Sequence, residues 1–358
     1  MNDAQFMHRA LELAEKGRYS TSPNPMVGCV IVRDGRVVAE GFHERAGLPH
    51  AEIEALTACH DDPRGATLYV NLEPCSHHGR TPPCADALIE AGVARVVVAT
   101  GDPNPEVAGA GIDRLRAAGI VVEVGLLGDE ARKLNEKFLV SAATGRPFVL
   151  LKAAITLDGK LATESRSSRW ITSGEARERS LALREEYDAI LVGAGTIATD
   201  DPELTRRLGL STSITPWMRV VVDATGRVPV GARVLHDGGR TLLVTSSPSR
   251  ITSSPGLEIV SGVPDSWDES LDASLTELGA RGCRSVIVEG GSGIHSALIR
   301  RRLWNKMAIF VAPKIIGGPS APSLLGGDAV TDLADAWAIR FDSVEPVGPD
   351  LLITAYPE

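Results

Sequence analysis

Short hydrophobic runs alternate with amphipathic stretches along the first 145 residues. An opening helix is predicted up to about Lys16, with Gly17 ending it. The runs at residues 27–33 and 37–43 flank Asp34-Gly35, a dipeptide typical of a hairpin turn. Later strands are predicted at residues 66–73, 94–101 and 120–125, and helices after Pro49, after Pro82-Pro83, at 111–119 and at 128–145. This alternation predicts a three-layer α/β domain.

A second α/β pattern starts after Gly145-Arg146-Pro147, which we take as the domain boundary. We therefore expect one domain over residues 1–146 and another over 147–358. Its predicted elements are strands at 148–160, 188–195, 219–224, 240–246, 285–291 and 307–313, with a helix near 173–186. Residues 245–266 are rich in Ser and Pro and are predicted to form a surface loop.

Composition narrows the class of protein. A chain of 358 residues favours about two domains. The net charge of −9 and a pI near 5.5 argue against nucleic-acid and anionic-membrane partners, which need a basic face. The N-terminal stretch carries acidic residues and is not a signal peptide, and no apolar run approaches a membrane span. Five scattered cysteines argue against a disulfide framework, so a cytoplasmic protein is expected.

His50, Cys75 and Cys84 form a candidate zinc site. A catalytic zinc ion keeps three protein ligands and one open position for water. Two thiolates and a neutral histidine balance the charge of Zn²⁺. His50 and Cys84 both stand where helices are predicted to begin, and a helix N-terminus favours thiolate over thiol.

Glu52 lies two residues after His50 and is better placed as a proton shuttle than as a fourth ligand. Nucleobase deaminases that use zinc carry a similar pattern, H-x-E followed by P-C-x-x-C, although here eight residues separate the two cysteines. Two alternatives stay open. The His and Glu are also ordinary residues for a helix start, and a structural zinc site could be closed by His77 or His78.

Four stretches of the first half have a distinctive sequence: TSPNPMVGCVIV (21–32), HAEIEAL (50–56), LEPCSHHGRTPPC (72–84) and GDPNPEVAGAGIDRL (101–115). In these stretches the chain resembles the deaminase half of the bacterial bifunctional deaminase–reductases of riboflavin biosynthesis, in which the wide cysteine spacing is usual. The resemblance implies a cytidine-deaminase-like fold. It also implies a pyrimidine pocket formed by Asn24, His43 and His77, and a phosphoribosyl site formed by Arg80 and Asn104. Each Asn also stands in a Pro-Asn-Pro turn, where its side chain can serve the backbone instead.

The second half contains two glycine-rich stretches, VGAGTIA at 192–198 and VEGGSG at 288–293. Taken alone, the first is a loose form of the dinucleotide fingerprint and lacks a clear acidic residue about twenty positions on, so a structural strand-to-helix turn accounts for it equally well. In the second, Gly290, Gly291 and Gly293 open a predicted helix whose free N–H groups suit a phosphate.

Five further stretches of the second half are distinctive: LLKAAITLDGKLAT (150–163), SRWITS (168–173), LREEYDAILVGAGT (183–196), TDDPELTRR (199–207) and VEGG (288–291). In these stretches the chain resembles the reductase half of the same family, whose fold is similar to dihydrofolate reductase. The resemblance implies NADPH contacts at Ala154, Trp170, Thr196, Asp200 and Gly290 to Gly293. It implies substrate contacts at Ser168, Arg184, Leu204, Arg207 and Glu289, where an arginine fork would suit the phosphate. If the resemblance is set aside, Arg184 is interpreted as a solvated charge on a helix and Arg207 as one partner of an ion pair in a loop.

The resemblance as a whole implies a bifunctional enzyme. The first domain would deaminate 2,5-diamino-6-ribosylamino-4(3H)-pyrimidinone 5′-phosphate with zinc, and the second would use NADPH to reduce the ribosyl to the ribityl chain. One departure matters: Ala224 stands where the family commonly has a serine near the cofactor. This departure leaves open a deaminase with an impaired reductase half. Two further alternatives are a relative acting on another pyrimidine and a non-catalytic zinc-containing ligand-binding protein. Whether the chain forms a homo-oligomer is left open.

Overall fold

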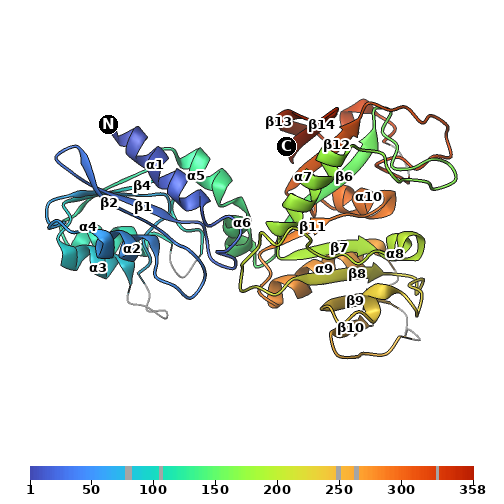
Figure 1. The fold of residues 1–358 in the computed structure, drawn as a ribbon, viewed down its shortest axis with the longest axis horizontal. Coiled ribbons are helices and arrows are strands. Elements are labelled where there is room, and N and C mark those ends of the chain that lie inside the picture. Colours follow the sequence, from blue (N-terminus) through green and yellow to red (C-terminus); the bar gives the residue numbers. More distant parts are fainter. Residues whose placement is uncertain (77–82, 105–107, 247–250, 262–265, 328–329) are drawn as a thin grey trace. The chain divides into compact units, whose positions relative to one another are not determined.

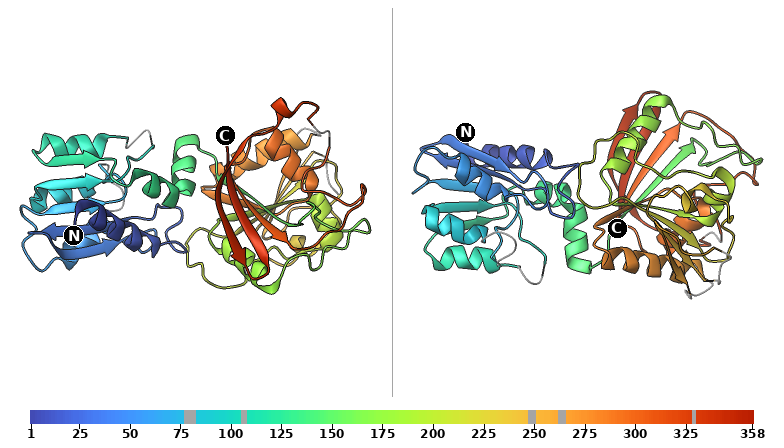
Figure 2. Two further views of the ribbon diagram at one scale, coloured as in Figure 1. Left: turned by 90° about the horizontal axis from the view of Figure 1, so that it is seen from above. Right: turned by 60° about the horizontal axis from the view of Figure 1, so that its bottom comes forward.

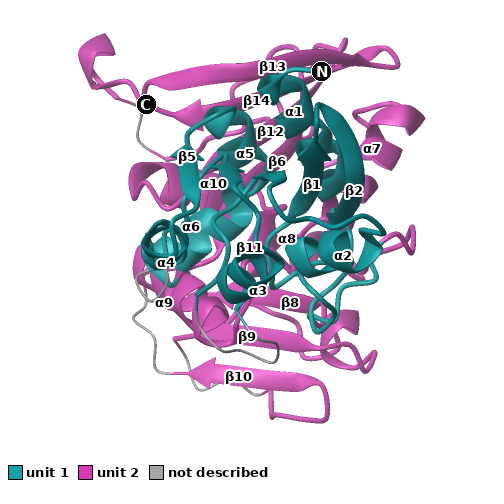
Figure 3. Ribbon diagram, turned by 90° about the vertical axis from the view of Figure 1, so that its left-hand side faces the viewer, with its two compact units in different colours: residues 1–145, 211–215 teal, residues 146–210, 216–358 magenta. Residues whose placement is uncertain are grey.

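A computed structural model describes residues 1–76, 83–104, 108–246, 251–261, 266–327 and 330–358 (Figure 1). The chain forms two compact units (Figure 3). Unit 1 contains Met1–Gly145 and Ser211–Thr215, and unit 2 contains Arg146–Leu210 and Pro216–Glu358. The main division falls after Gly145, whereas the assignment of 211–215 to unit 1 has no counterpart in the sequence pattern. No helix among the described residues is long and apolar enough to cross a membrane.

Unit 1 is built on a five-stranded sheet with the order β2-β1-β3-β4-β5. β1 pairs antiparallel with β2 and β3, while β3, β4 and β5 run parallel. Its elements are α1 (Asp3–Glu15), β1 (Gly28–Arg33), β2 (Arg36–Phe42), α2 (Ala51–Ala58), β3 (Thr67–Val70), α3 (Cys84–Ala91), β4 (Arg95–Val98), α4 (Ala110–Ala117), β5 (Val121–Val124), α5 (Gly128–Leu134) and α6 (Glu136–Thr144).

Helices cover both faces of this sheet, because successive side chains of a strand point to opposite sides. Val30 of β1 packs in one core cluster with residues of α1 and α5. Its neighbour Ile31 packs in another cluster with residues of α2, α3 and α4. Figures 1 and 2 show the resulting three layers. The three-layer prediction is confirmed, and so is the hairpin, whose turn residues Asp34 and Gly35 have φ of 49° and 72°.

The prediction of one polar helix over residues 128–145 is wrong in one respect. The segment forms two helices, α5 and α6, which meet at Asn135. The Asn135 side chain is buried and accepts the Met26 N–H at 2.8 Å while its amide donates to the Met26 carbonyl at 2.8 Å. This pairing holds Asn135 at φ −102°, outside helical geometry. A contact between residues 109 positions apart therefore breaks a helix that local propensity favours.

Unit 2 is built on a nine-stranded sheet with the order β10-β9-β8-β7-β11-β6-β12-β14-β13. All pairs from β10 to β12 are parallel, and β14 and β13 add antiparallel strands. The elements are β6 (Phe148–Thr156), α7 (Gly174–Glu185), β7 (Ala189–Gly193), α8 (Ala194–Asp200), β8 (Met218–Asp223), the 3-10 helix η1 (Arg233–Leu235), β9 (Thr241–Thr245), β10 (Leu257–Ser261), α9 (Trp267–Ala280), β11 (Ser285–Val288), α10 (Ser292–Arg300), β12 (Lys306–Ala312), the 3-10 helix η2 (Leu333–Asp335), β13 (Ile339–Val347) and β14 (Asp350–Pro357).

The central strands of unit 2 are buried along their whole length, as parallel strands covered on both faces are. Leu271 and Leu275 of α9 and Ala297 and Leu298 of α10 pack in one core cluster with these strands. In a parallel sheet the carboxyl ends of the strands share one edge, which is where ligands bind in open α/β folds. The segments after β7, β8 and β11 therefore meet at that edge.

The surface-loop prediction for residues 245–266 is wrong in part, because β10 lies within it. β10 pairs in parallel with β9, with Leu257 opposite Thr241. β10 is one of the two edge strands of the sheet, and Leu257 is the only fully buried residue of this strand. An edge strand with so little buried surface has no strong hydrophobic pattern, so the Ser and Pro residues around it dominate the sequence signal.

Candidate functional site

Two helix starts and the segment between them bring together the candidate metal ligands. His50 is the N-cap of α2, and Cys84 is the first residue of α3, directly after its N-cap Pro83. Cys75 follows β3. Both helices begin at the same end of the sheet, so their side chains converge although His50 and Cys84 are 34 positions apart.

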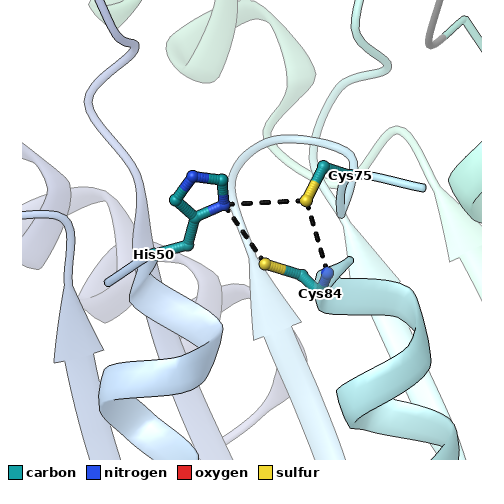
Figure 4. Close-up of side chains that lie close together, drawn as sticks. All are labelled: His50, Cys75 and Cys84. Atoms are coloured by element: carbon teal, nitrogen blue, oxygen red, sulfur yellow. Dashed lines mark hydrogen bonds between the residues drawn. The ribbon is translucent and has the colours of Figure 1, made fainter. Parts of the chain in front are cut away.

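The three ligand atoms form a compact cluster, all within 4.8 Å of one another (Figure 4). His50 Nδ1 lies 3.2 Å from Cys84 Sγ and 3.6 Å from Cys75 Sγ, and the Cys84 backbone N–H donates to Cys75 Sγ at 3.3 Å. Ligands of a tetrahedral zinc ion lie roughly 3.5–3.8 Å apart, given Zn–N and Zn–S bonds of about 2.0 and 2.3 Å. Spacing and donor type therefore fit zinc. His77 and His78, the alternative fourth ligands, lie outside the described residues.

The protonation of the cluster also fits a cation. The Cys84 thiol, His50 and the Cys84 backbone N–H stabilise a thiolate on Cys75 and lower its pKa. The hydrogen bond to that thiolate, together with burial, raises the pKa of Cys84, so without an ion Cys84 keeps its proton. A bound divalent cation would take the place of this proton, because thiolates are the metal-binding form.

Glu52 lies in the first turn of α2 and is only 3 % exposed. Burial raises the pKa of its carboxyl to about 7, although the His50 charge opposes the shift and the Cys84 thiol donates a hydrogen bond to it. A carboxyl group that exchanges its proton near neutral pH, beside three metal ligands, is suited to general acid–base chemistry.

Asn24 and His43 are joined by a hydrogen bond, and His43 lies beside the metal ligand His50. His43 Nδ1 lies 2.9 Å from the Pro49 carbonyl, so it carries the proton, and Nε2 then accepts from the Asn24 amide at 3.0 Å. The His43 ring meets the His50 ring edge-on, with 5.5 Å between centroids. Among the described residues, the Asn24 carbonyl oxygen and second N–H have no partner and could meet a base edge. His43 is thus next to His50, and Asn24 is next to His43. His77 and Arg80 lie outside the described residues.

Glu73 is a residue of this region that the sequence pattern did not single out. Its carboxylate is 5 % exposed and accepts four backbone N–H groups at 3.0–3.4 Å; the donors are Asp102, Gly109, Gly111 and Ile112. These hydrogen bonds hold the segment after β4, which carries Asn104, against Glu73, which directly precedes Pro74-Cys75. In the sequence, the feature that could have pointed to Glu73 is its position as a charged residue at the end of the hydrophobic run 66–73.

Unit 2 contains a hollow of about 420 Å³ at the carboxyl ends of β7 and β11. Seven of the residues expected to bind cofactor or substrate line it, namely Ser168, Thr196, Asp200, Glu289, Gly290, Gly291 and Gly293. A side chain at Gly195, Gly291 or Gly293 would point into open space, so these glycines leave the backbone accessible. Accessible backbone N–H groups before α10 suit the diphosphate of a dinucleotide, and the hollow therefore fits NADPH.

Glu289 is held between two cations at the floor of this hollow. Arg184 donates to it through Nε and Nη2 at 2.5 and 2.9 Å, and Lys152 donates at 3.3 Å. Burial opposes ionisation of Glu289, but the two positive charges outweigh it and lower its pKa to about 2. Arg184 is therefore a buried ion-pair partner and not a solvated helix charge. The sequence pattern did not single out Lys152 as a functional residue. Its position as a lysine within the hydrophobic run 148–155 could have pointed to it.

Five expected contact residues do not line the hollow: Arg184, which pairs with Glu289 as described above, and four others. Ala154 lies half-buried on β6. Trp170 is 64 % exposed, with the Arg177 guanidinium 4.6 Å above its ring. The Leu204 side chain is buried, and Arg207 pairs with Glu203 at 3.4 Å, which is the loop ion pair considered above. Ala224 is buried after β8, and the Ser246 hydroxyl donates to its carbonyl at 2.5 Å.

Family models match both halves of the chain, and relatives match it over nearly its whole length. The model of the RibD C-terminal domain matches residues 147–353, and that of the cytidine and deoxycytidylate deaminase zinc-binding region matches residues 1–100. The riboflavin biosynthesis protein RibD of Escherichia coli is 42 % identical over 99 % of both chains, and that of Aquifex aeolicus is 41 % identical over 98 % of this chain and 97 % of its own.

Solved structures agree. Acinetobacter baumannii RibD, form 1, superposes with a TM-score of 0.89 at 37 % identity over 99 % of both chains. A diaminohydroxyphosphoribosylaminopyrimidine deaminase/5-amino-6-(5-phosphoribosylamino)uracil reductase from Thermotoga maritima superposes with a TM-score of 0.86 at 39 % identity, over 99 % of this chain and 98 % of the other. The expected fold, a cytidine-deaminase-like domain followed by a reductase domain, is confirmed.

Proposed function

Because the chain belongs to the RibD family of bifunctional deaminase–reductases of riboflavin biosynthesis, we propose that it carries out two consecutive reactions on one pyrimidine nucleotide. Unit 1 deaminates 2,5-diamino-6-ribosylamino-4(3H)-pyrimidinone 5′-phosphate to 5-amino-6-(5-phosphoribosylamino)uracil. Unit 2 then reduces the ribosyl to the ribityl chain with NADPH. The observation that carries this proposal is the His50–Cys75–Cys84 cluster with the buried Glu52 beside it.

In unit 1, His50, Cys75 and Cys84 would hold zinc, which supplies Lewis acidity when bound. Glu52 takes the proton of the attacking water and returns it to the departing ammonia, since its pKa lies near neutrality. Asn24 and His43 hold the pyrimidine edge, with the second proton of the Asn24 amide and its oxygen facing the base. His77, Arg80 and Asn104 complete the substrate site in this proposal.

In unit 2, bound NADPH would supply a hydride, and the residues of the hollow would orient the cofactor and the substrate towards each other. Thr196, Asp200 and the segment Gly290 to Gly293 line the hollow and would hold the cofactor. Ala154 and Trp170 lie outside this lining, and their cofactor contacts are proposed from the family resemblance alone. Glu289 and Arg184 contact the substrate, with Ser168, Leu204 and Arg207. Because Lys152 and Arg184 keep Glu289 ionised, it presents an acceptor to substrate hydroxyl groups.

All five cysteines of the chain are free thiols, which persist in a reducing compartment. The proposal therefore places both reactions in the cytoplasm. Its substrate is a small pyrimidine nucleotide, and the acidic net charge of −9 opposes use of a nucleic acid.

A product analysis separates the proposal from its alternatives. Purified protein is incubated with the diaminopyrimidine nucleotide, with and without NADPH, and the products are weighed by mass spectrometry. We expect replacement of one amino group by oxygen without NADPH, and addition of two hydrogens when NADPH is present. Deamination without reduction would indicate an impaired reductase half, as Ala224 allows. No conversion at all would indicate a ligand-binding protein.

A further inference from the structure

We propose that Arg227 binds the 2′-phosphate of NADPH and so selects the phosphorylated cofactor. The inference rests on the proposed NADPH-dependent reduction in unit 2 and names the residue that sets its cofactor preference. Arg227 lies in the turn after β8 and lines the same hollow as Thr196, Asp200 and Gly290 to Gly293.

The strand order places Arg227 at one end of this hollow. The order of neighbouring strands here is β8, β7, β11, β6. Glu289 directly follows β11, and Lys152 lies on β6, so β7 separates both from β8. A dinucleotide across the carboxyl ends of these strands has its nicotinamide at the substrate, and hence near Glu289. Its adenosine half then extends towards β8, so the ribose 2′-position approaches the turn that carries Arg227.

The backbone of this turn is fixed, while the Arg227 side chain is exposed. Asp223 is 1 % exposed and its carboxylate accepts the N–H groups of Arg227 and Val228, both at 2.8 Å. Within the described part of the chain, the Arg227 guanidinium has no ion pair or hydrogen bond. Two buried arginines of unit 2 are instead paired with carboxylates, Arg184 with Glu289 and Arg219 with Asp237. The backbone of Arg227 is therefore held by Asp223, while the donors of its guanidinium have no partner among the described residues.

A guanidinium fork suits a phosphate monoester, to which it can donate two parallel hydrogen bonds. The neighbouring position 224 is an alanine and offers no hydroxyl group to a cofactor phosphate. Recognition of a 2′-phosphate at this end of the hollow then depends on Arg227. Arg166, the other arginine that lines the hollow, comes from the segment after β6, two residues before the expected substrate contact Ser168.

The test is direct binding of NADP⁺ and NAD⁺ by isothermal titration calorimetry to the full chain and three variants. The unmodified protein should bind NADP⁺ more tightly. Arg227→Ala should lose about ten- to a hundredfold in affinity for NADP⁺ and leave NAD⁺ affinity unchanged, since a charged hydrogen bond to phosphate is removed. Arg227→Lys should retain part of the preference. Arg166→Ala, the matched control, should keep the NADP⁺/NAD⁺ ratio of the unmodified protein.

The inference is overturned if Arg227→Ala keeps the same NADP⁺/NAD⁺ ratio, or if Arg166→Ala abolishes it instead. Equal binding of the two cofactors by the unmodified protein, with NADPH oxidation by deaminated substrate intact, would also overturn it and leave the proposed reductase standing. Binding of neither dinucleotide, with no NADPH oxidation, would remove the proposed reductase as well.

Discussion

Glu52 and Glu289 are both largely buried glutamates, but their surroundings give them opposite acidities. Glu52 lies beside thiol and imidazole groups, and burial raises its pKa to about 7. Glu289 lies between Lys152 and Arg184, and their charges lower its pKa to about 2. A group that gains and loses its proton near pH 7 can shuttle it, whereas one that stays ionised serves as an acceptor.

Glu52→Gln should abolish proton transfer while preserving shape. We expect deamination to fall by roughly 10²–10⁴-fold, the usual contribution of one acid–base group. Zinc content measured by atomic absorption should stay near that of the unmodified protein, because an amide of the same size would not disturb the three ligands. NADPH-dependent reduction of the deaminated substrate should continue. Ammonia release close to the original rate would show that Glu52 is not the shuttle.

Glu289→Gln should change how the stability of unit 2 depends on pH. The carboxyl has a pKa of about 2 when folded and an ordinary value of 4.5, so its ionised form favours the folded state. That contribution is complete above about pH 4.5 and is lost as the pH falls towards 2. At pH 7 the variant should lose about 3–5 kcal/mol of unfolding free energy, because it leaves Lys152 and Arg184 buried without a counter-charge.

The measurement is urea unfolding followed by tryptophan fluorescence at pH 7 and pH 3. All five tryptophans lie in unit 2, so the signal reports on that unit alone; they are Trp170, Trp217, Trp267, Trp304 and Trp337. The gap between the two proteins should be smaller at pH 3. A gap that does not change with pH would contradict the assigned pKa. Glu123→Gln, an exposed change in unit 1, is the control.

At the scale of elements, helix starts position the chemistry of unit 1. α2 begins directly after His50 and α3 begins at Cys84, while Glu73 at the end of the β3 run holds the N-terminus of α4. Gly111 lets α4 come this close, since a Cβ there would lie 1.9 Å from the Pro74 carbonyl. One buried carboxylate thus joins the segment of a metal ligand to the segment of Asn104.

Glu73→Gln should loosen this segment without removing the metal. The amide keeps one acceptor oxygen and turns N–H donors towards N–H donors, which costs about 1–3 kcal/mol for each group left unpaired. We expect KM for the nucleotide to rise about tenfold or more, with zinc content retained and kcat changed less. Steady-state deamination assays and metal analysis check this. Loss of zinc together with activity would mean that Glu73 supports the fold as a whole.

At the scale of the whole molecule, each unit has its own sheet, its own core and its own candidate site. The described site residues of unit 1 all come from residues 1–145, and those of unit 2 all come from 146–210 and 216–358. The two reactions should therefore fail separately.

Cys84→Ser tests this separation. It removes a thiolate ligand, so zinc and deamination should both be lost. Reduction of deaminated substrate with NADPH should continue, with the tryptophan unfolding midpoint of unit 2 unchanged. Loss of reduction alongside deamination, with unit 2 still folded, would mean that the sites depend on each other. Stoichiometric zinc in the variant would reject the ligand assignment.

The sequence by itself determined the features that depend on residue type and short-range spacing. His50, Cys75, Cys84 and Glu52 were recognisable because zinc chemistry requires those side chains, and the hairpin at Asp34-Gly35 because that turn needs positive φ. The alternation of strands and helices was visible because buried strands must be hydrophobic.

Only the tertiary structure decided what depends on contacts between distant residues. The break at Asn135 follows from its pairing with Met26, β10 forms because β9 offers it an edge, and Lys152, Arg184 and Glu289 meet because β6 and β11 are neighbours in the sheet. Local sequence cannot show these pairings, because the partners lie 16 to 137 positions apart and their energies appear only once the sheets have formed. The same holds for Glu73, whose four N–H partners arrive from 29 to 39 residues away.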